Sequence, residues 1–278
     1  MTTVQAGQGV RDYAGINGLR MYYEVHGVGE PLVLLHGGFG AVEMFGDVLR
    51  LLSENRKVIG VELQAHGRTA DIDRTLRYEL MAEDVAGLIK HLGLDKADVM
   101  GYSLGGGVAL RTAIQHPELV RKLVVVSTAF KRRGWYPEIL TAMSQSESAV
   151  EPMKQTPMYE LYSRIAPRPA DWPVLFAKLG ELLRRDYDWS EDVKKIKAPT
   201  MIVIGDADSI RTSHAVEFFE LLGGGKVDGG WDGSGMSNAR LAILPGVTHY
   251  NIFSAPALAF VVELFLEAPI KEPRLDEK

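Results

Sequence analysis

The feature that most restricts the fold of this chain is segment 101–106, GYSLGG, which stands between two apolar runs. The run before it, ADVM, is typical of a buried strand, and the run after it, VALRTAI, is typical of a helix. The chain therefore turns sharply from strand to helix, with Ser103 at the apex. Such a cramped turn needs small residues, and Gly101 and Gly105 supply them two positions on either side.

Ser103 is a candidate nucleophile, because the pattern G-x-S-x-G between a strand and a helix projects the serine hydroxyl above the sheet. The next N–H, on Leu104, then points toward a bound carbonyl oxygen, and the positive end of the helix favours negative charge there. The alternative is an ordinary glycine-rich turn with Ser103 as a helix cap, as in dinucleotide-binding folds. The remainder of the chain has to distinguish the two interpretations.

The composition is that of a globular protein with one large core. The chain has 278 residues, of which 46% are hydrophobic and 24% charged, so neither a disordered nor a fibrous chain is expected. A net charge of −5 argues against a nucleic-acid partner, and we expect the tight basic cluster KRR at 131–133 to be a solvated loop. The absence of cysteine excludes disulfides, thiolate catalysis and cysteine-bound metals.

The N-terminal sequence lacks the pattern of a secretory signal, in which an apolar stretch follows a basic one. No apolar run approaches the length that spans a membrane. We therefore expect a cytoplasmic protein without a membrane partner.

Apolar, β-forming runs alternate with amphipathic segments along most of the chain, which predicts a mostly parallel sheet with helices on both faces. The expected strands are an antiparallel hairpin at 14–27 and strands at 31–37, 57–63, 97–100, 122–128, 199–206 and 239–246. The expected helices are at 41–54, 78–92, 104–116, 212–222 and 255–267.

This alternation stops between residues 129 and 198, where the sequence is helical in character, interrupted by prolines and rich in aromatic and methionine side chains. A gap of this length is unusual for a simple crossover. It predicts a helical cap, 129–198, inserted into a core domain formed by 1–128 and 199–278. For any single aromatic side chain, a place in the small core of the cap itself is the better interpretation, but collectively they predict an apolar substrate pocket.

A second glycine-rich segment, HGGFG, follows the apolar run that starts at Pro31. Glycines directly after a central strand let backbone N–H groups approach a ligand closely, so the N–H of Gly38 or Phe39 is a candidate second donor to an oxyanion. A plain strand-to-helix turn is the alternative.

A nucleophilic serine needs an adjacent base, and a carboxylate must orient that base. Of the seven histidines, His249 follows the last strand of the sheet, and Asp208 follows the preceding one. The chain order is then Ser103, Asp208, His249. Asp206 is the competing acid, but it lies nearer the end of its strand, where we expect it to fix the turn.

Three other polar residues are expected to be structural. His66 and Arg68 lie on the polar loop QAHGRT, and His116 lies at the C-terminal end of a helix, where a cation suits the helix dipole.

Five segments in this order, LLHGGFG, the HGRT loop, GYSLGG, VIGDADS and LPGVTHY, resemble the α/β-hydrolase superfamily, particularly its compact esterase, lactonase and carbon–carbon hydrolase branch. The resemblance covers the chain from about Leu19 to Leu266. It implies an α/β-hydrolase fold with a mostly parallel eight-stranded sheet and an inserted helical cap. The roles that it implies are nucleophile for Ser103, acid for Asp208, base for His249, and oxyanion donors for Leu104 and for Gly38 or Phe39.

At two positions the sequence differs from motifs of other branches of the superfamily, and these differences argue against those branches. Haloalkane dehalogenases and epoxide hydrolases carry an aspartate where this chain has Ser103. HGGFG also lacks the proline of the HGGPG pattern of proline iminopeptidases.

The predicted activity is hydrolysis of a carboxylic ester of a small apolar substrate, through an acyl-enzyme on Ser103. This chemistry requires neither a metal ion nor an organic cofactor. A lactonase or a carbon–carbon bond hydrolase would use the same triad, and a ligand-binding protein without turnover could share the fold. The expected partner is therefore a small-molecule ester or lactone.

Overall fold

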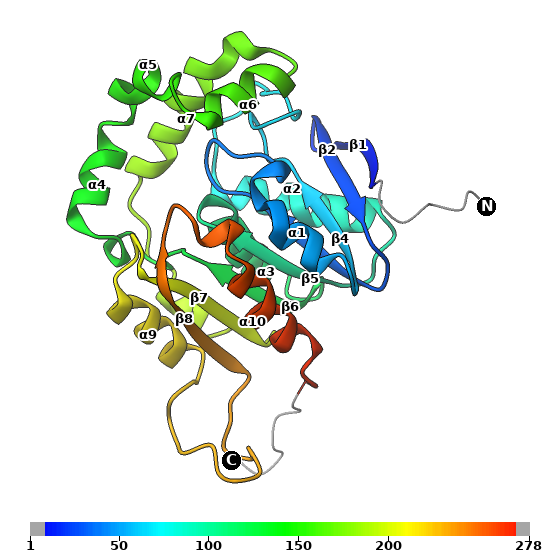
Figure 1. Ribbon diagram of the computed structural model, residues 1–278, viewed down its shortest axis with the longest axis vertical. Coiled ribbons are helices and arrows are strands. Elements are labelled where there is room, and N and C mark those ends of the chain that lie inside the picture. The colour runs from blue at the N-terminus through cyan, green and yellow to red at the C-terminus, as the bar shows by residue number, and fades with distance from the viewer. Residues whose placement is uncertain (1–8, 271–278) are drawn as a thin grey trace.

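An eight-stranded sheet runs through the computed structural model, which describes residues 9–270 (Figure 1). The predicted charged tail at 271–278 lies outside the described residues. The strands are β1 (Val10–Ile16), β2 (Leu19–His26), β3 (Glu30–Leu35), β4 (Arg56–Val61), β5 (Ala97–Tyr102), β6 (Val120–Val126), β7 (Thr200–Ala207) and β8 (Ala239–Thr248).

The spatial order of the strands is β1-β2-β4-β3-β5-β6-β7-β8. The pairs β1–β2 and β2–β4 are antiparallel, and every other neighbouring pair in the described sheet is parallel. The predicted opening hairpin and the mostly parallel sheet are thus confirmed. Because the parallel strands point the same way, β5, β7 and β8 end at one edge of the sheet.

The central strands are buried on both faces, which explains why they are continuous apolar runs in the sequence. Successive residues of β3 face opposite sides: Leu32 and Leu34 belong to one hydrophobic cluster, and Val33 and Leu35 belong to the other. The sheet therefore separates two cores, each of which has to be covered by helices.

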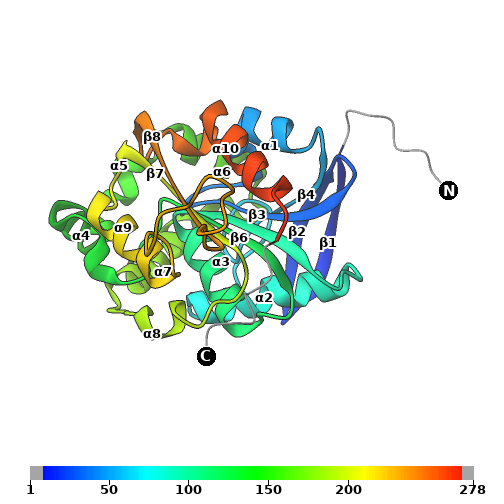
Figure 2. The same ribbon diagram turned by 90° about the horizontal axis from the view of Figure 1, so that it is seen from below.

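Helices cover both faces of the sheet (Figure 2). On one side, α1 (Gly46–Leu52) and α10 (Pro256–Glu267) bury side chains in the cluster of Leu32 and Leu34. On the other side, α2 (Tyr78–His91), α3 (Leu104–Gln115) and α9 (Thr212–Leu221) bury side chains in the cluster of Val33 and Leu35. Two short 3-10 turns, η1 (Val42–Phe45) and η5 (Ile252–Ser254), precede α1 and α10.

The segment between β6 and β7 is helical, and most of it gathers at one end of the molecule (Figure 1). Its helices are α4 (Pro137–Ser144), α5 (Val150–Met153), α6 (Pro157–Ile165), α7 (Trp172–Arg184) and α8 (Ser190–Val193), and its 3-10 turns are η2 (Arg132–Gly134), η3 (Ser146–Ala149) and η4 (Pro169–Asp171). Prolines lie in the first turns of α4, α6 and α7, where the missing N–H leaves no hydrogen bond unmade. They therefore start helices here.

Strand β6 ends at Val126, two residues earlier than the sequence predicts. Ser127 has φ 52°, which is outside the β region, so the chain leaves the sheet at this residue. Ser127 and Thr128 consequently lie on the loop that follows β6, at the edge of the sheet where β5 and β7 also end.

Candidate active site

Ser103 lies between β5 and α3 in a strained backbone conformation, with φ 52° and ψ −114°. Surrounding hydrogen bonds hold it there. Its N–H donates to the carbonyl oxygen of Val126 (2.9 Å), and its own carbonyl oxygen accepts from the N–H of Gly107 (3.1 Å) and from Oγ1 of Thr128 (2.8 Å). A non-glycine residue in this region costs on the order of 1–3 kcal/mol, so it persists only where its surroundings enforce it.

The two glycines that flank Ser103 are needed for backbone contacts. A Cβ on Gly101 would collide with the carbonyl group of Gly105. A Cβ on Gly105 would collide with the carbonyl groups of Leu35 and His36, at the end of β3. Gly105 thus lets α3 start directly beside the central strand.

His249 follows β8 directly, and its ring lies between Ser103 and Asp208. Its Nε2 is 3.1 Å from Oγ of Ser103, and its Nδ1 is 3.0 Å from Oδ1 of Asp208. With the proton on Nδ1, His249 donates to the carboxylate and accepts from the serine hydroxyl. The loop is anchored by Tyr102, whose hydroxyl donates to the carbonyl oxygen of His249 (2.7 Å).

Asp208 is buried at the end of β7 and fully hydrogen-bonded. Its Oδ1 accepts from the N–H of Ile210 (3.2 Å) as well as from His249, and its Oδ2 accepts from the N–H of Gly205 (3.1 Å) and from Oγ of Ser127. Burial alone would raise the pKa of Asp208, but its hydrogen bonds to His249, Ser127 and Gly205 hold that pKa below the ordinary value. The carboxylate is therefore ionised at neutral pH.

Asp206, the competing acid, lies elsewhere. Its Oδ1 accepts from the N–H groups of Gly246 (2.9 Å) and Val247 (3.3 Å), so it binds the turn in β8. Ser127 is the residue that sequence analysis missed. The available signal was the polar pair Ser-Thr directly after the apolar run VVV, next to the strand that carries Asp208.

The three backbone N–H groups predicted to bind an oxyanion make no hydrogen bond within the described part of the chain. Within residues 9–270, the N–H groups of Gly38, Phe39 and Leu104 have no acceptor in the protein. Phe39 has φ 60°, so the turn after β3 is held in an uncommon conformation as well. All three predicted donors are thus without a partner among residues 9–270, and their role as oxyanion donors stays a prediction.

Two buried histidines support the turn after β3. His36 accepts from the N–H of Leu63 at Nε2 (3.1 Å) and donates from Nδ1 to the carbonyl oxygen of Gly37 (2.7 Å). The ring of His66 lies 5.0 Å from that of His36, and its Nδ1 donates to the carbonyl oxygen of Gln64 (2.8 Å). Burial lowers the pKa of His36 to about 4 and that of His66 to about 3, so both are neutral.

The two remaining polar residues also contact carboxylates or helix ends. Arg68 forms ion pairs with Glu62 (2.7 Å) and Glu43. His116 follows α3 and lies 2.9 Å from a carboxylate oxygen of Glu83. Neither side chain is in contact with Ser103, His249 or Asp208 among the described interactions.

Aromatic side chains surround the region above Ser103. The ring of Phe39 lies 4.2 Å from that of Phe176 and 5.6 Å from that of Trp172, both on α7. Trp135 meets the ring of His249 edge-on at 5.5 Å. A small hollow beside Phe39 is also lined by apolar side chains of α6, among them Leu161. Apolar side chains of α6 and α7 thus lie against the turn that carries Phe39.

The fold agrees with known proteins. The model of a family described as having the alpha/beta hydrolase fold matches residues 30–159. The crystal structure of E-2-(acetamidomethylene)succinate hydrolase superposes with a TM-score of 0.74 at 19% sequence identity, covering 94% of this chain and 100% of that chain. The chain therefore has the α/β-hydrolase fold.

Curated members of the superfamily with different activities match parts of the chain. An sn-1-specific diacylglycerol lipase of Danio rerio is 31% identical over 135 residues, which are 48% of this chain and 40% of that protein. A soluble epoxide hydrolase of a Corynebacterium strain is 38% identical over 113 residues, which are 41% of this chain and 40% of that protein. The chain matches less than half the length of these relatives. None of the helices in residues 9–270 is long and apolar enough to cross a membrane.

Proposed function

We propose that this protein is a serine hydrolase that cleaves a carboxylic ester of a small apolar substrate through an acyl-enzyme on Ser103. The observation that carries the proposal is the continuous hydrogen-bonded path from Oγ of Ser103 through the ring of His249 to the buried carboxylate of Asp208. Serine hydrolases need such a path, because the hydroxyl is a weak nucleophile until an oriented base removes its proton.

In the first half of the reaction, Oγ of Ser103 attacks the ester carbonyl carbon and its proton passes to Nε2 of His249. The imidazolium that forms is stabilised by Asp208 through Nδ1. The carbonyl oxygen, now negatively charged, is held by the N–H of Leu104 and by that of Gly38 or Phe39. His249 then returns the proton to the leaving alcohol, and the acyl group stays on Ser103.

In the second half, a water molecule gives a proton to Nε2 of His249 and attacks the acyl carbon. The same N–H groups stabilise the second oxyanion. Collapse of this intermediate releases the acid, and Ser103 recovers its proton from His249. A lactone would follow the same steps, except that the leaving alcohol would stay attached to the acid.

The preference for an apolar substrate is inferred from helix α7 and its neighbours. We assign residues 129–198 as a cap on a core of 1–128 and 199–278, because α7 contributes Phe176 and Trp172 to the wall beside Phe39. Leu179, also on α7, lies over Gly38. An acyl chain placed on Ser103 would therefore meet apolar side chains of the cap.

The test of the proposed nucleophile is labelling with a fluorophosphonate, which reacts with activated serines, followed by peptide mass spectrometry. The expected adduct is on Ser103 and is lost in Ser103→Ala. Ser144→Ala is the matched control, since Ser144 is exposed on α4 and its hydroxyl bonds only to the carbonyl oxygen of Leu140. Labelling of Ser103→Ala at the wild-type rate would overturn the assignment.

The substrate is tested with p-nitrophenyl esters from acetate to decanoate. We expect turnover with a preference for short or medium acyl chains. If labelling occurs and none of these esters is cleaved, a series of lactones and diketones is the next assay, because lactonases and carbon–carbon hydrolases would use the same triad.

A further inference from the structure

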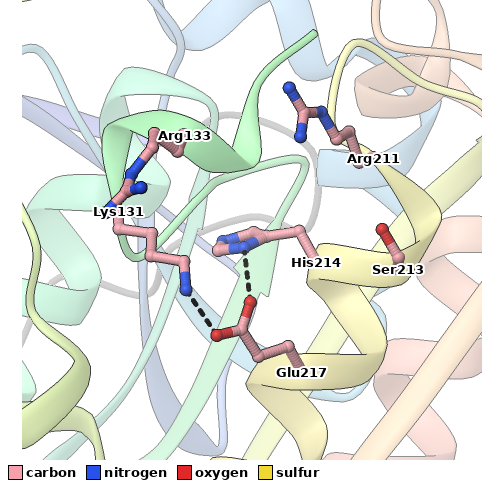
Figure 3. A pocket seen from close by; sticks show the side chains of 6 residues that line it. All are labelled: Lys131, Arg133, Arg211, Ser213, His214 and Glu217. Atoms are coloured by element: carbon pink, nitrogen blue, oxygen red, sulfur yellow. Dashed lines mark hydrogen bonds and ion pairs between the residues drawn. The ribbon is translucent and has the colours of Figure 1, made fainter.

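A second cavity, of about 310 Å³, lies apart from Ser103, between the loop that follows β6 and the start of α9 (Figure 3). Lys131 and Arg133 come from the loop, and Arg211 precedes α9. The remaining lining residues, Ser213, His214 and Glu217, lie on α9. None of the three residues of the proposed triad lines this cavity, so any ligand bound here would be separate from the substrate.

The lining carries more positive than negative charge, since it contains three cationic side chains and one carboxylate. Glu217 is already occupied: Lys131 forms an ion pair with one of its oxygens, and Nδ1 of His214 lies 3.5 Å from the other (Figure 3). The segment 131–133 is thus only partly the solvated loop expected from the sequence, because Lys131 is tied to α9.

His214 forms a neutral floor for the cavity. Its Nε2 accepts from the N–H of Phe130 (3.2 Å), and its ring stacks on that of Phe130 at 4.2 Å. Burial lowers the pKa of His214 to about 4, and the charges of Lys131 and Arg211 act in the same direction. The proton on Nδ1 is therefore directed at Glu217, and His214 adds no charge to the cavity.

The guanidinium groups of Arg133 and Arg211 have no partner of their own. Among residues 9–270, no carboxylate forms an ion pair with either group and no acceptor receives a hydrogen bond from either. Asp188 interacts with Arg133 through charge alone, since its carboxylate is hydrogen-bonded to Ser190. Two unpaired guanidinium groups thus line the same concave site.

We propose that this cavity binds a small anion, in which a phosphate or carboxylate group is held by Arg133 and Arg211. Guanidinium groups match both anions, because their planar N–H donors can bind two oxygens at once. The exposed hydroxyl of Ser213 offers a further donor at the rim. The volume is at the lower end of the range for small-molecule sites, which excludes a large ligand.

The wall of the cavity is continuous with the loop that carries Asp208. The N–H of Arg211 donates to the carbonyl oxygen of Gly134 (3.0 Å). Trp135, which follows Gly134, pairs with Ile210, which precedes Arg211, in an isolated β-bridge. Ile210 in turn donates to Asp208. An anion that pulls Arg133 and Arg211 together therefore acts on a segment one hydrogen bond away from the proposed triad.

The test is titration of the purified full chain with inorganic phosphate and, separately, with succinate, followed by calorimetry and compared with sodium chloride at equal ionic strength. We expect saturable binding of at least one of the two anions. Binding of phosphate alone would assign the ligand as a phosphoryl compound, and binding of succinate alone would assign a carboxylate. Absence of saturable binding by both would overturn the proposal.

Two variants locate the binding. The double variant Arg133→Gln/Arg211→Gln should weaken it about tenfold or more, since it removes the charged donors. Arg132→Gln, with the same change of charge one residue away, should leave it unchanged, because Arg132 bonds to the carbonyl oxygen of Leu183 outside the cavity. If the double variant and Arg132→Gln weakened binding equally, the anion would be attracted to the basic surface without a specific site. Unaltered binding by the double variant would also contradict the proposed site.

A second readout does not depend on a ligand. Without added anion, the double variant should melt at a temperature equal to or higher than that of the wild type, because it relieves repulsion between unpaired charges. Phosphate or succinate should raise the melting temperature of the wild type and not that of the double variant. A large loss of stability in the double variant without anion would show that the arginines serve the fold instead.

Discussion

Ser127 donates a hydrogen bond to Oδ2 of Asp208, while His249 approaches Oδ1 of the same carboxylate. The N–H groups of Gly205 and Ile210 bind one oxygen each. Four donors thus offset the burial of Asp208, and one of them comes from the loop after β6. The acid of the proposed triad is therefore held by β7 and its loop, and by the loops that follow the two neighbouring strands, β6 and β8.

Replacing Ser127 should lower kcat without abolishing it. Ser127→Gly is the suitable variant, because glycine tolerates φ 52° and the whole hydroxymethyl group that binds Asp208 is removed. Loss of one hydrogen bond to a charged group should reduce kcat by about tenfold and leave KM nearly unchanged. The variant and the wild type are compared in steady-state ester hydrolysis. An unchanged kcat would contradict a role of Ser127 in positioning Asp208.

Removing the proposed nucleophile should have a far larger effect. Ser103→Ala should lower kcat by roughly three to six orders of magnitude, and Asp208→Asn by about four, because the asparagine would stabilise the wrong tautomer of His249. Asp206→Asn is the matched control, since Asp206 binds the turn in β8 and should leave kcat near the wild-type value. If Asp206→Asn were the more damaging of the two aspartate variants, Asp206 would be the acid.

Because α3 lies directly beside β3, adding one methyl group at Gly105 should lower the stability of the fold strongly. Gly105→Ala would place a Cβ against the carbonyl groups of Leu35 and His36, and should destabilise the fold by on the order of 1–3 kcal/mol. In Gly15→Ala the added methyl meets no atom within 4 Å, and φ is not positive, so stability should change little. Urea unfolding of both variants measures the difference. Equal stability would mean that α3 can shift away from β3 at no cost.

Buried titratable groups predict how stability depends on pH. A histidine of the unfolded chain titrates near pH 6.5, whereas the pKa is about 4 for His36 and about 3 for His66 in the folded protein. Between these values the unfolded chain binds more protons, so the free energy of unfolding falls as the pH drops below about 6.5. Glu62 acts in the opposite direction. Burial raises its pKa to about 7, so between about pH 4.5 and 7 the folded state binds more protons and gains stability as the pH falls.

Two variants separate these contributions. His66→Asn removes one titrating histidine and should reduce the dependence of the unfolding free energy on pH by about 1.4 kcal/mol per pH unit between roughly pH 4.5 and 6. Glu62→Gln removes the opposing group and should make that dependence steeper. Chemical denaturation at half-unit steps of pH measures both slopes. Slopes that move in the same direction would contradict the assigned charge states.

The sheet and its helices could be predicted because parallel strands covered on both faces leave a distinct pattern, a run such as PLVLLHG followed by a helix. The order Ser103, Asp208, His249 could be predicted for a related reason, since strands that end at one edge bring the following residues together. The structure places these side chains in hydrogen-bonding contact, and their catalytic roles stay a prediction.

Ser127 and the cavity of Arg133 and Arg211 could not be predicted from the sequence. Both depend on pairings between residues about 80 positions apart, Ser127 with Asp208 and Lys131 with Glu217. Periodicity describes which face of an element is buried and carries no information on which polar side chains meet across two loops. The strand order, in which β6 lies beside β7, supplies that information.

The packing of Leu179 and Phe176 on Gly38 and Phe39 has a consequence for redesign. The helices between β6 and β7 resemble an exchangeable module, because they occupy one continuous insertion. Yet α7 contacts the turn whose N–H groups would hold the oxyanion under the proposed function. The helices that would select the substrate would then also influence the geometry at the reacting carbonyl. Transplanting this insertion into another hydrolase would transfer selectivity only if the turn 36–40 were transplanted with it.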